Sequence, residues 1–167
     1  ADGNPITADL EVQHVCVAGD VMDITTGSII TTAAQPIKSK KNTFTLTIEA
    51  GRTVETTGGS IAILAYGNNQ TITNNGGTIR VSNSSKDNAI KVQGDTFILD
   101  NNINGTIQAP SYAVNVSGDS ATITNSGTIF GTTLRAIYLN STGHTITNES
   151  DGTIKAGESD WDTSGGT

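Results

Sequence analysis

Apolar and polar residues alternate along this chain in short segments that return at a nearly constant interval. One segment has the form I-T-N…G-T-I and occupies residues 72–79, 99–107, 123–129 and 146–154. A second has the form A-I-x-V, in which two apolar residues flank a variable one. A spacing of two places alternate side chains on one face of a β-strand and does not fit a helix. The pattern therefore predicts several short strands in every repeat.

The repeat length can be measured from the first apolar residue of each phrase. In the four clear copies this residue advances by 27, 24 and 23 positions, through Ile72, Leu99, Ile123 and Ile146. Two weaker copies, assigned to Ile24 and Ile48, continue the series toward the N-terminus at steps of 24 residues. A period of this size indicates that each segment packs against its neighbours in the same way, as the coils of a stacked array do.

Three more apolar columns follow the same interval. The first contains Val54, Ile79, Ile107, Ile129 and Ile154; the second Ile63, Ile90, Val114 and Ile137; the third Ala65, Val92, Val116 and Leu139. Because β-branched residues dominate these positions and Gly and Asn separate the strands, each coil should close on itself and stack on the next. We expect an all-β fold, a single-domain right-handed parallel β-helix (β-solenoid) of about six coils of roughly 23–27 residues with an N-terminal cap.

The remaining residues are expected at the two ends of the solenoid. Residues 1–23 carry an alternating segment, LEVQHVCVAGDV, that does not match the repeat, and we interpret them as an N-terminal cap that shields the first coil. Residues 24–157 form the coils. Residues 158–167 are interpreted as the C-terminal tail of a fragment of a longer chain, because an uncovered solenoid end is an exposed edge.

Asn recurs two positions after the first apolar residue of each clear phrase, at Asn74, Asn101, Asn125 and Asn148. Stacked Asn side chains can hydrogen-bond from coil to coil, and Asn tolerates the left-handed backbone of a sharp corner. We predict a structural Asn ladder, although Asn as an ordinary turn residue would also fit a solenoid. Thr26 and Ala50 are assigned to this position in the weaker coils, so the ladder is expected to begin at Asn74.

The composition agrees with a thin core and argues against two classes of partner. Hydrophobic residues make up 34% of the chain and aromatic residues 4%, which suits columns of Ile, Val, Leu, Thr and Ala. The net charge of −7, with nine Lys and Arg residues, offers no basic footprint for a nucleic acid. No apolar stretch approaches the roughly 20 residues of a membrane-spanning helix. We expect no nucleic-acid partner and no membrane span in this fragment.

The residues of the outward-facing columns give little indication of a catalytic site. Carbohydrate-active enzymes of this shape need carboxylates on adjacent coils. One outward column reads Glu49, Thr73, Asp100, Thr124 and Thr147, and another reads Glu55, Arg80, Gln108, Phe130 and Lys155. Two His residues and one Cys cannot supply a Ser-His-Asp arrangement or a metal-binding His/Cys set. We therefore expect no catalytic residues, no metal and no cofactor.

The I-T-N…G-T-I phrases, each followed by an A-I-x-V half-coil, resemble the repeats of autotransporter passenger domains, the secreted β-helical segments of Gram-negative type V secretion proteins. The resemblance covers residues 48–157 and, more weakly, 24–39. It implies a secreted or bacterial cell-surface location, a role in adhesion and virulence, and a parent protein with a signal peptide and an outer-membrane β-barrel. The alternatives are a polysaccharide lyase, hydrolase or tailspike-like enzyme, and a structural stalk or self-association module.

A ligand-binding surface should consist of outward side chains that the stack of coils brings together. Tyr138 is the outward residue of the segment AIYL, and Tyr112 and Arg135 lie at the preceding corner. Phe130 lies on the neighbouring strand. Exposed Tyr, Phe and Arg are common anchors of protein contacts, and aromatic faces stack on sugars, although single exposed apolar residues are also ordinary. These four residues are the predicted ligand-binding set, for a host-cell surface protein or glycan or for another copy of the chain.

Overall fold

The chain winds into a parallel β-solenoid in which each coil contributes one strand to each of three six-stranded sheets. This computed structural model describes residues 14–16, 19, 21–32, 35–82 and 87–157, and no helix occurs among them. From the first to the last strand of a sheet, the chain makes about five turns of the solenoid. All strand pairs within the three sheets are parallel. The fold class expected from the sequence is therefore confirmed at the level of a parallel β-solenoid.

The strands of the three sheets follow one another in the order C, A, B within each coil. Sheet C contains β1 (His14–Cys16), β4 (Ile37–Ser39), β7 (Ile63–Ala65), β10 (Ile90–Val92), β13 (Tyr112–Val116) and β16 (Arg135–Leu139). Sheet A contains β2 (Val21–Ile24), β5 (Thr45–Glu49), β8 (Thr71–Asn75), β11 (Ile98–Asn101), β14 (Thr122–Asn125) and β17 (Thr145–Asn148). Sheet B contains β3 (Ile29–Thr31), β6 (Thr53–Thr56), β9 (Thr78–Val81), β12 (Thr106–Ala109), β15 (Thr128–Gly131) and β18 (Thr153–Ala156).

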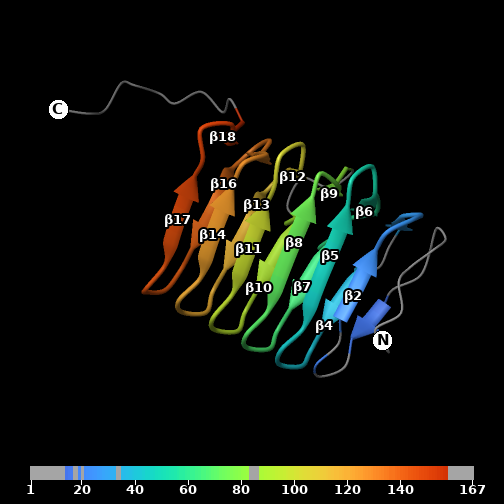
Figure 1. The fold of residues 1–167 in the computed structure, drawn as a ribbon, viewed down its shortest axis with the longest axis horizontal. Coiled ribbons are helices and arrows are strands. Elements are labelled where there is room, and N and C mark those ends of the chain that lie inside the picture. Colours follow the sequence, from blue (N-terminus) through green and yellow to red (C-terminus); the bar gives the residue numbers. More distant parts are fainter. Residues whose placement is uncertain (1–13, 17–18, 20, 33–34, 83–86, 158–167) are drawn as a thin grey trace.

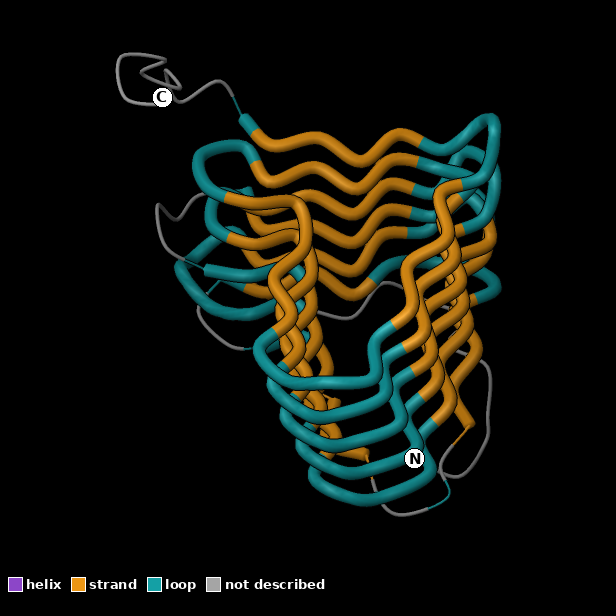
Figure 2. Tube along the Cα trace, turned by 90° about the vertical axis from the view of Figure 1, so that its left-hand side faces the viewer, coloured by secondary structure: helices purple, strands orange, loops and turns teal. Residues whose placement is uncertain are grey.

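The sheets stand as the sides of a tube around one narrow core. Figure 1 shows the strands of sheet A side by side, from β2 in blue to β17 in red. Figure 2, turned by 90°, shows three stacks of strands enclosing the interior, with loops at the corners. Ile79 of sheet B lies opposite Val54 on one side and Ile107 on the other, and all three are fully buried. Burying each such side chain stabilises the fold by about 1.5–3 kcal/mol.

The two N-terminal coils are aligned two residues earlier than the sequence pattern suggested. The observed pairs are Leu46 with Ile72, Ile48 with Asn74, Met22 with Leu46, and Ile24 with Ile48. The predicted starts at Ile24 and Ile48 were therefore wrong. Both Leu46 and Ile48 face the core and are fully buried, so a phrase located by one apolar residue could be placed at either. A shift of two residues keeps apolar side chains on the same face, so the motif alone does not set the register.

This shift changes two further assignments. The position occupied by Asn in the later coils holds Ile24 and Ile48 in the first two, not Thr26 and Ala50. Glu49 lies opposite Asn75, and Thr47 takes its place opposite Thr73. Asp100 is flanked in its outward column by Thr73 and Thr124, so no carboxylate adjoins it there.

Part of the segment interpreted as an N-terminal cap belongs to the sheets themselves. β1 pairs with β4 in sheet C, and β2 pairs with β5 in sheet A. The predicted first coil residue, Ile24, is the last residue of β2. The other parts of the predicted cap, at residues 1–13, 17, 18 and 20, and the predicted tail, at 158–167, lie outside the described residues.

A left-handed residue marks the corner between sheets C and A in every coil. Gly19, Thr43, Asn69, Thr96, Ser120 and Gly143 all have φ between 57° and 75°. This conformation costs a non-Gly residue roughly 1–2 kcal/mol. Hydrogen bonds between coils offset the cost: the Thr43 N–H donates to the Asn68 carbonyl and the Asn69 N–H to the Asp95 carbonyl, each over 2.9 Å. The corner is thus repeated with the same backbone geometry from coil to coil.

Candidate functional site

The four recurrent Asn residues form a continuous ladder of side-chain hydrogen bonds inside the solenoid. The Nδ2 of Asn74 donates to the Oδ1 of Asn101 over 2.8 Å, Asn101 donates to Asn125 over 2.7 Å, and Asn125 donates to Asn148 over 2.8 Å. The first three side chains are buried and Asn148 is exposed. We call these four residues the interior Asn ladder. Its amides are used for coil-to-coil bonding and are not presented to a ligand.

Each ladder residue also closes its own corner between sheets A and B. The same Nδ2 atoms donate to the carbonyls of Gly77, Gly105, Gly127 and Gly152, over distances of 3.1, 3.3, 3.1 and 2.8 Å. The Gly carbonyl lies three, four, two and four residues after the Asn in the successive coils. The corner therefore varies in length while both of its ends keep the same hydrogen bonds.

The Gly of each G-T-I phrase is required by close packing. A Cβ on Gly105 would lie 2.4 Å from Asn101 Oδ1, and one on Gly127 would lie 2.3 Å from the Gly105 carbonyl oxygen. Neither distance leaves room for a carbon atom, and the neighbours are a bonded amide and backbone. The Asn and Gly columns thus depend on one another.

A second polar ladder, which the sequence analysis missed, follows the outer corner between sheets C and A. The side chains of Asn42, Asn68, Asp95 and Asp119 each accept a hydrogen bond from a backbone N–H of the next coil, over 2.9, 2.9, 2.8 and 3.0 Å respectively. We call these four residues the Asx corner ladder. Asp119 also accepts from the hydroxyls of Ser141 and Thr142. These hydrogen bonds hold the pKa of Asp119 below its ordinary value.

A signal for this ladder is present in the sequence. Gly-Asn or Gly-Asp follows the A-I-x-V segment at residues 67–68, 94–95 and 118–119, at the same period as the other columns. A Cβ on Gly94 would lie 2.0 Å from the Gly67 carbonyl oxygen, which explains the Gly. Asp95 and Asp119 occupy adjacent coils, but each has an oxygen bonded to backbone, so their proximity has a structural cause.

Three of the four predicted ligand-binding residues meet on the outer side of sheet C. The rings of Tyr112 (β13) and Tyr138 (β16) stack with centroids 5.1 Å apart and planes inclined by 20°. The guanidinium carbon of Arg135 lies 5.5 Å from the Tyr138 centroid. Such aromatic and cation–π contacts contribute roughly 0.5–1.5 kcal/mol each. We call Tyr112, Arg135 and Tyr138 the Tyr–Arg cluster.

Phe130, the fourth predicted residue, lies on β15 in sheet B. Its ring is covered by the ammonium group of Lys155 from the next coil, 4.5 Å from the centroid. A hollow of about 330 Å³ adjoins this pair. Phe130 therefore belongs to a different side of the tube from the Tyr–Arg cluster.

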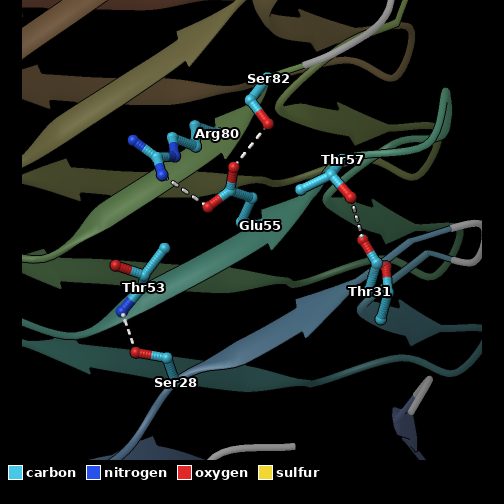
Figure 3. Close-up of polar contacts among 7 residues, drawn as sticks. All are labelled: Ser28, Thr31, Thr53, Glu55, Thr57, Arg80 and Ser82. Atoms are coloured by element: carbon cyan, nitrogen blue, oxygen red, sulfur yellow. Dashed lines mark hydrogen bonds and ion pairs between the residues drawn. The ribbon is translucent and has the colours of Figure 1, made fainter. Parts of the chain in front are cut away.

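Sheet B also carries a buried carboxylate on its outward column. Glu55 is 4% exposed and its Oε2 lies 2.8 Å from Arg80 Nη2, while the hydroxyl of Ser82 donates to Oε1 over 2.5 Å (Figure 3). Burial raises the pKa of Glu55, but the hydrogen bonds from Arg80 and Ser82 and the Arg80 charge outweigh this effect, and the net pKa is lowered. An ionised, fully bonded Glu of this kind serves as a tie between two coils.

Figure 3 shows two more ties between the first coils of sheet B. The Thr53 N–H donates to the Ser28 hydroxyl over 3.1 Å, and the Thr57 hydroxyl donates to the Thr31 carbonyl over 3.3 Å. With Glu55 and Arg80 they form a row of polar links along the tube. The contacts of Glu55 among the described residues are Arg80 and Ser82, and they include neither a His nor a second carboxylate.

Groups for metal binding are not gathered in the described part of the chain. Within residues 14–16, 19, 21–32, 35–82 and 87–157, no set of three or more His, Cys, Asp or Glu side chains could hold a metal ion. A hollow of about 450 Å³ at the corner between sheets A and B includes Gly105, Gly127 and the single carboxylate of Asp151. Glycoside hydrolysis requires two carboxylates, and this hollow contains one.

Comparison of the chain with protein-family models, with curated proteins and with solved structures found no match. In the portion that the structure describes, no helix has the length and apolar character needed to cross a membrane.

Proposed function

We propose that this solenoid is a binding module without catalytic activity, which acts in adhesion or host-ligand binding as part of a secreted or surface-displayed autotransporter passenger. The observation that carries the proposal is the Tyr–Arg cluster. Tyr112, Tyr138 and Arg135 gather on the last two strands of sheet C, where Arg135 is exposed and both rings are half-buried. Tyr and Arg are among the residue types most enriched at binding hot spots.

The recurrent residues of the coil support this assignment because packing already occupies them. The interior Asn ladder bonds to itself and to Gly carbonyls, and the Asx corner ladder bonds to backbone. What differs from coil to coil is the outward side chains. A solenoid presents such side chains as an extended face, and recognition is expected there.

The arrangement of the cluster indicates what kind of contact it would make. Because Tyr112 and Tyr138 stack on one another, one face of each ring is already covered. The cluster also offers phenol hydroxyls and the Arg135 guanidinium, which hydrogen-bond and attract negative charge. A ligand with hydroxyl and acidic groups fits these donors better than an apolar peptide does.

The test is attachment of the purified chain to cultured host cells and to a glycan array. Tyr138→Ala and Arg135→Ala should each reduce attachment, about tenfold or more if they are hot spots. Tyr66→Ala is the matched control, because Tyr66 is another tyrosine, 40% exposed, that follows β7 outside the cluster. Equal attachment by all four proteins would contradict a binding role for the cluster.

The same preparations separate the other two functions. Shortening of an acidic polysaccharide during incubation, followed by chromatography, would indicate a polysaccharide-active enzyme instead of a binding module. Attachment no greater than that of an unrelated β-solenoid, together with an intact polysaccharide, would favour a structural stalk.

A further inference from the structure

The outer sides of the sheets differ in charge. The described strands of sheet C contain three cations, Lys38, Lys91 and Arg135, and no Asp or Glu. The strands of sheet A contain the opposite set, with Asp23, Glu49 and Asp100 and no Lys or Arg. In a chain with a net charge of −7, this separation gives sheet C a positive strip that sheet A lacks.

The register of sheet C fixes the spacing along this strip. The outward residues of successive strands are Lys38, Leu64, Lys91, Asn115 and Tyr138, and Arg135 begins the strand that carries Tyr138. Neighbouring strands lie about 4.8 Å apart, so Lys38 and Lys91, which are two coils apart, are separated by about 10 Å. Arg135 lies two coils beyond Lys91, but it is opposite Tyr112 and therefore displaced along the strand from the column that contains Tyr138. Leu64 and Asn115 between them are only 3% and 9% exposed. The cations are thus separated by positions that project little into solvent.

The charges of the strip are available for a partner. The ion pair between Glu55 and Arg80 lies on sheet B, and neither Lys38 nor Lys91 has an acidic partner among the described residues. The Oδ1 of Asn115, between Lys91 and Tyr138, is buried without a hydrogen-bond partner among those residues. A buried acceptor of this kind costs roughly 1–3 kcal/mol.

We propose that sheet C binds a linear acidic polysaccharide that runs parallel to the solenoid axis and carries about one negative charge per disaccharide. We call Lys38, Lys91, Arg135 and Tyr138 the sheet C strip. The inference rests on the proposed binding function and adds the chemical class of the ligand. Lys and Arg supply the charge match, and the Tyr138 phenol meets sugar hydroxyls.

The spacing favours a polysaccharide over other acidic chains. In an extended peptide, side chains on one face recur about every 6.8 Å, which does not match cations about 10 Å apart. Nucleic acids place their phosphates far more densely than one per about 10 Å. An acidic sugar in every second residue of a polysaccharide gives a longer interval, comparable to two coils.

The experiment measures binding of the purified chain to hyaluronate, which has one carboxylate per disaccharide, with neutral dextran and polyglutamate as comparison probes. The test variant is Lys38→Gln/Lys91→Gln. The control is Arg52→Gln/Lys155→Gln, which removes the same charge elsewhere: Arg52 bonds the Ala50 carbonyl, and Lys155 covers Phe130. Lys38 and Lys91 lie outside the Tyr–Arg cluster, so this test is independent of the one for the proposed function.

We expect hyaluronate to bind more tightly than dextran, and the test variant to bind about fivefold more weakly than wild type with a shallower salt dependence. The control should stay within about twofold of wild type. Equal weakening in both variants, or equal binding of dextran, would overturn the inference. Tighter binding of polyglutamate would overturn it in favour of an acidic peptide. Cell attachment that needs Tyr138, in a protein that does not bind hyaluronate, would overturn it and leave the proposed function standing.

Discussion

Asn74 donates a hydrogen bond to Asn101 over 2.8 Å, while its own Oδ1, opposite Ile48, is buried without a partner among the described residues. The interior Asn ladder therefore has a direction: the Nδ2 atoms of Asn74, Asn101 and Asn125 each donate to the coil that follows. It begins at an unmet acceptor, whose burial costs roughly 1–3 kcal/mol. This oxygen has no partner because the residue opposite Asn74 in the preceding coil is Ile48, whose side chain has no hydrogen-bond donor.

Asn101→Ala should destabilise the protein by about 3 kcal/mol. The change leaves Asn74 Nδ2 without its acceptor and Asn125 Oδ1 without its donor, both in the interior. Asn148→Ala, at the exposed end of the ladder, should cost about 1 kcal/mol or less. Urea unfolding followed by circular dichroism gives both values. Equal losses would mean that burial of the ladder does not matter.

Gly105→Ala should cost about 3 kcal/mol, because the new Cβ would meet Asn101 Oδ1 at 2.4 Å and the Asn102 carbonyl oxygen at 2.8 Å. Gly51→Ala separates this packing effect from backbone strain. Gly51 has φ of +73° and nothing within 4 Å of an added Cβ, so its substitution pays only the left-handed penalty, about 1 kcal/mol. Thermal unfolding of the two variants measures the difference. A larger loss for Gly51→Ala would refute the packing explanation.

The lowered pKa of Glu55 predicts that the protein loses stability at acidic pH. Its folded pKa lies below the ordinary value of 4.5, so the carboxylate stabilises the fold above that value. This contribution is lost as pH falls through the lower folded pKa, where the proton enters the pair with Arg80. The melting temperature of wild type should therefore drop more steeply below about pH 4.5 than that of Glu55→Gln. Parallel melting curves for the two proteins across this range would count against the ion pair.

Asp119→Asn should be tolerated, since Asn68 performs the same task two coils earlier by accepting from the Asp95 N–H. Asp119→Ala removes the acceptor for the Thr142 N–H and should open the last corner. Hydrogen exchange of the Thr142 amide tests this directly: faster exchange is expected in Asp119→Ala, and near wild-type exchange in Asp119→Asn at neutral pH. Rapid exchange in both variants would show that charge, rather than the acceptor, holds the corner.

Most of the fold could be predicted from the sequence because the same residue types recur at inward positions. The columns through Ile79 and Ile90 are in register as expected. The two N-terminal coils could not be aligned by the motif, because Leu46 and Ile48 are both apolar and both inward. Only pairing with Ile72 and Asn74 distinguishes them.

The candidate binding surface was less predictable, because it depends on contacts across strands. Tyr112 and Tyr138 are far apart in sequence and meet only through the offset between β13 and β16. Phe130 is closer to Tyr138 in sequence but lies on another sheet. The positive strip on sheet C is also invisible in the net charge, since acidic residues elsewhere outweigh it.

The corner between sheets A and B has a consequence for how such a chain can be modified. The Asn and Gly at its two ends keep their hydrogen bond whether the Gly comes two, three or four residues after the Asn. Added residues there extend into solvent and leave the stacked interior unchanged. The segment between Asn125 and Gly127, the shortest of these corners, is therefore a suitable place to graft a foreign peptide for display, and longer corners in other coils are natural examples of such insertions.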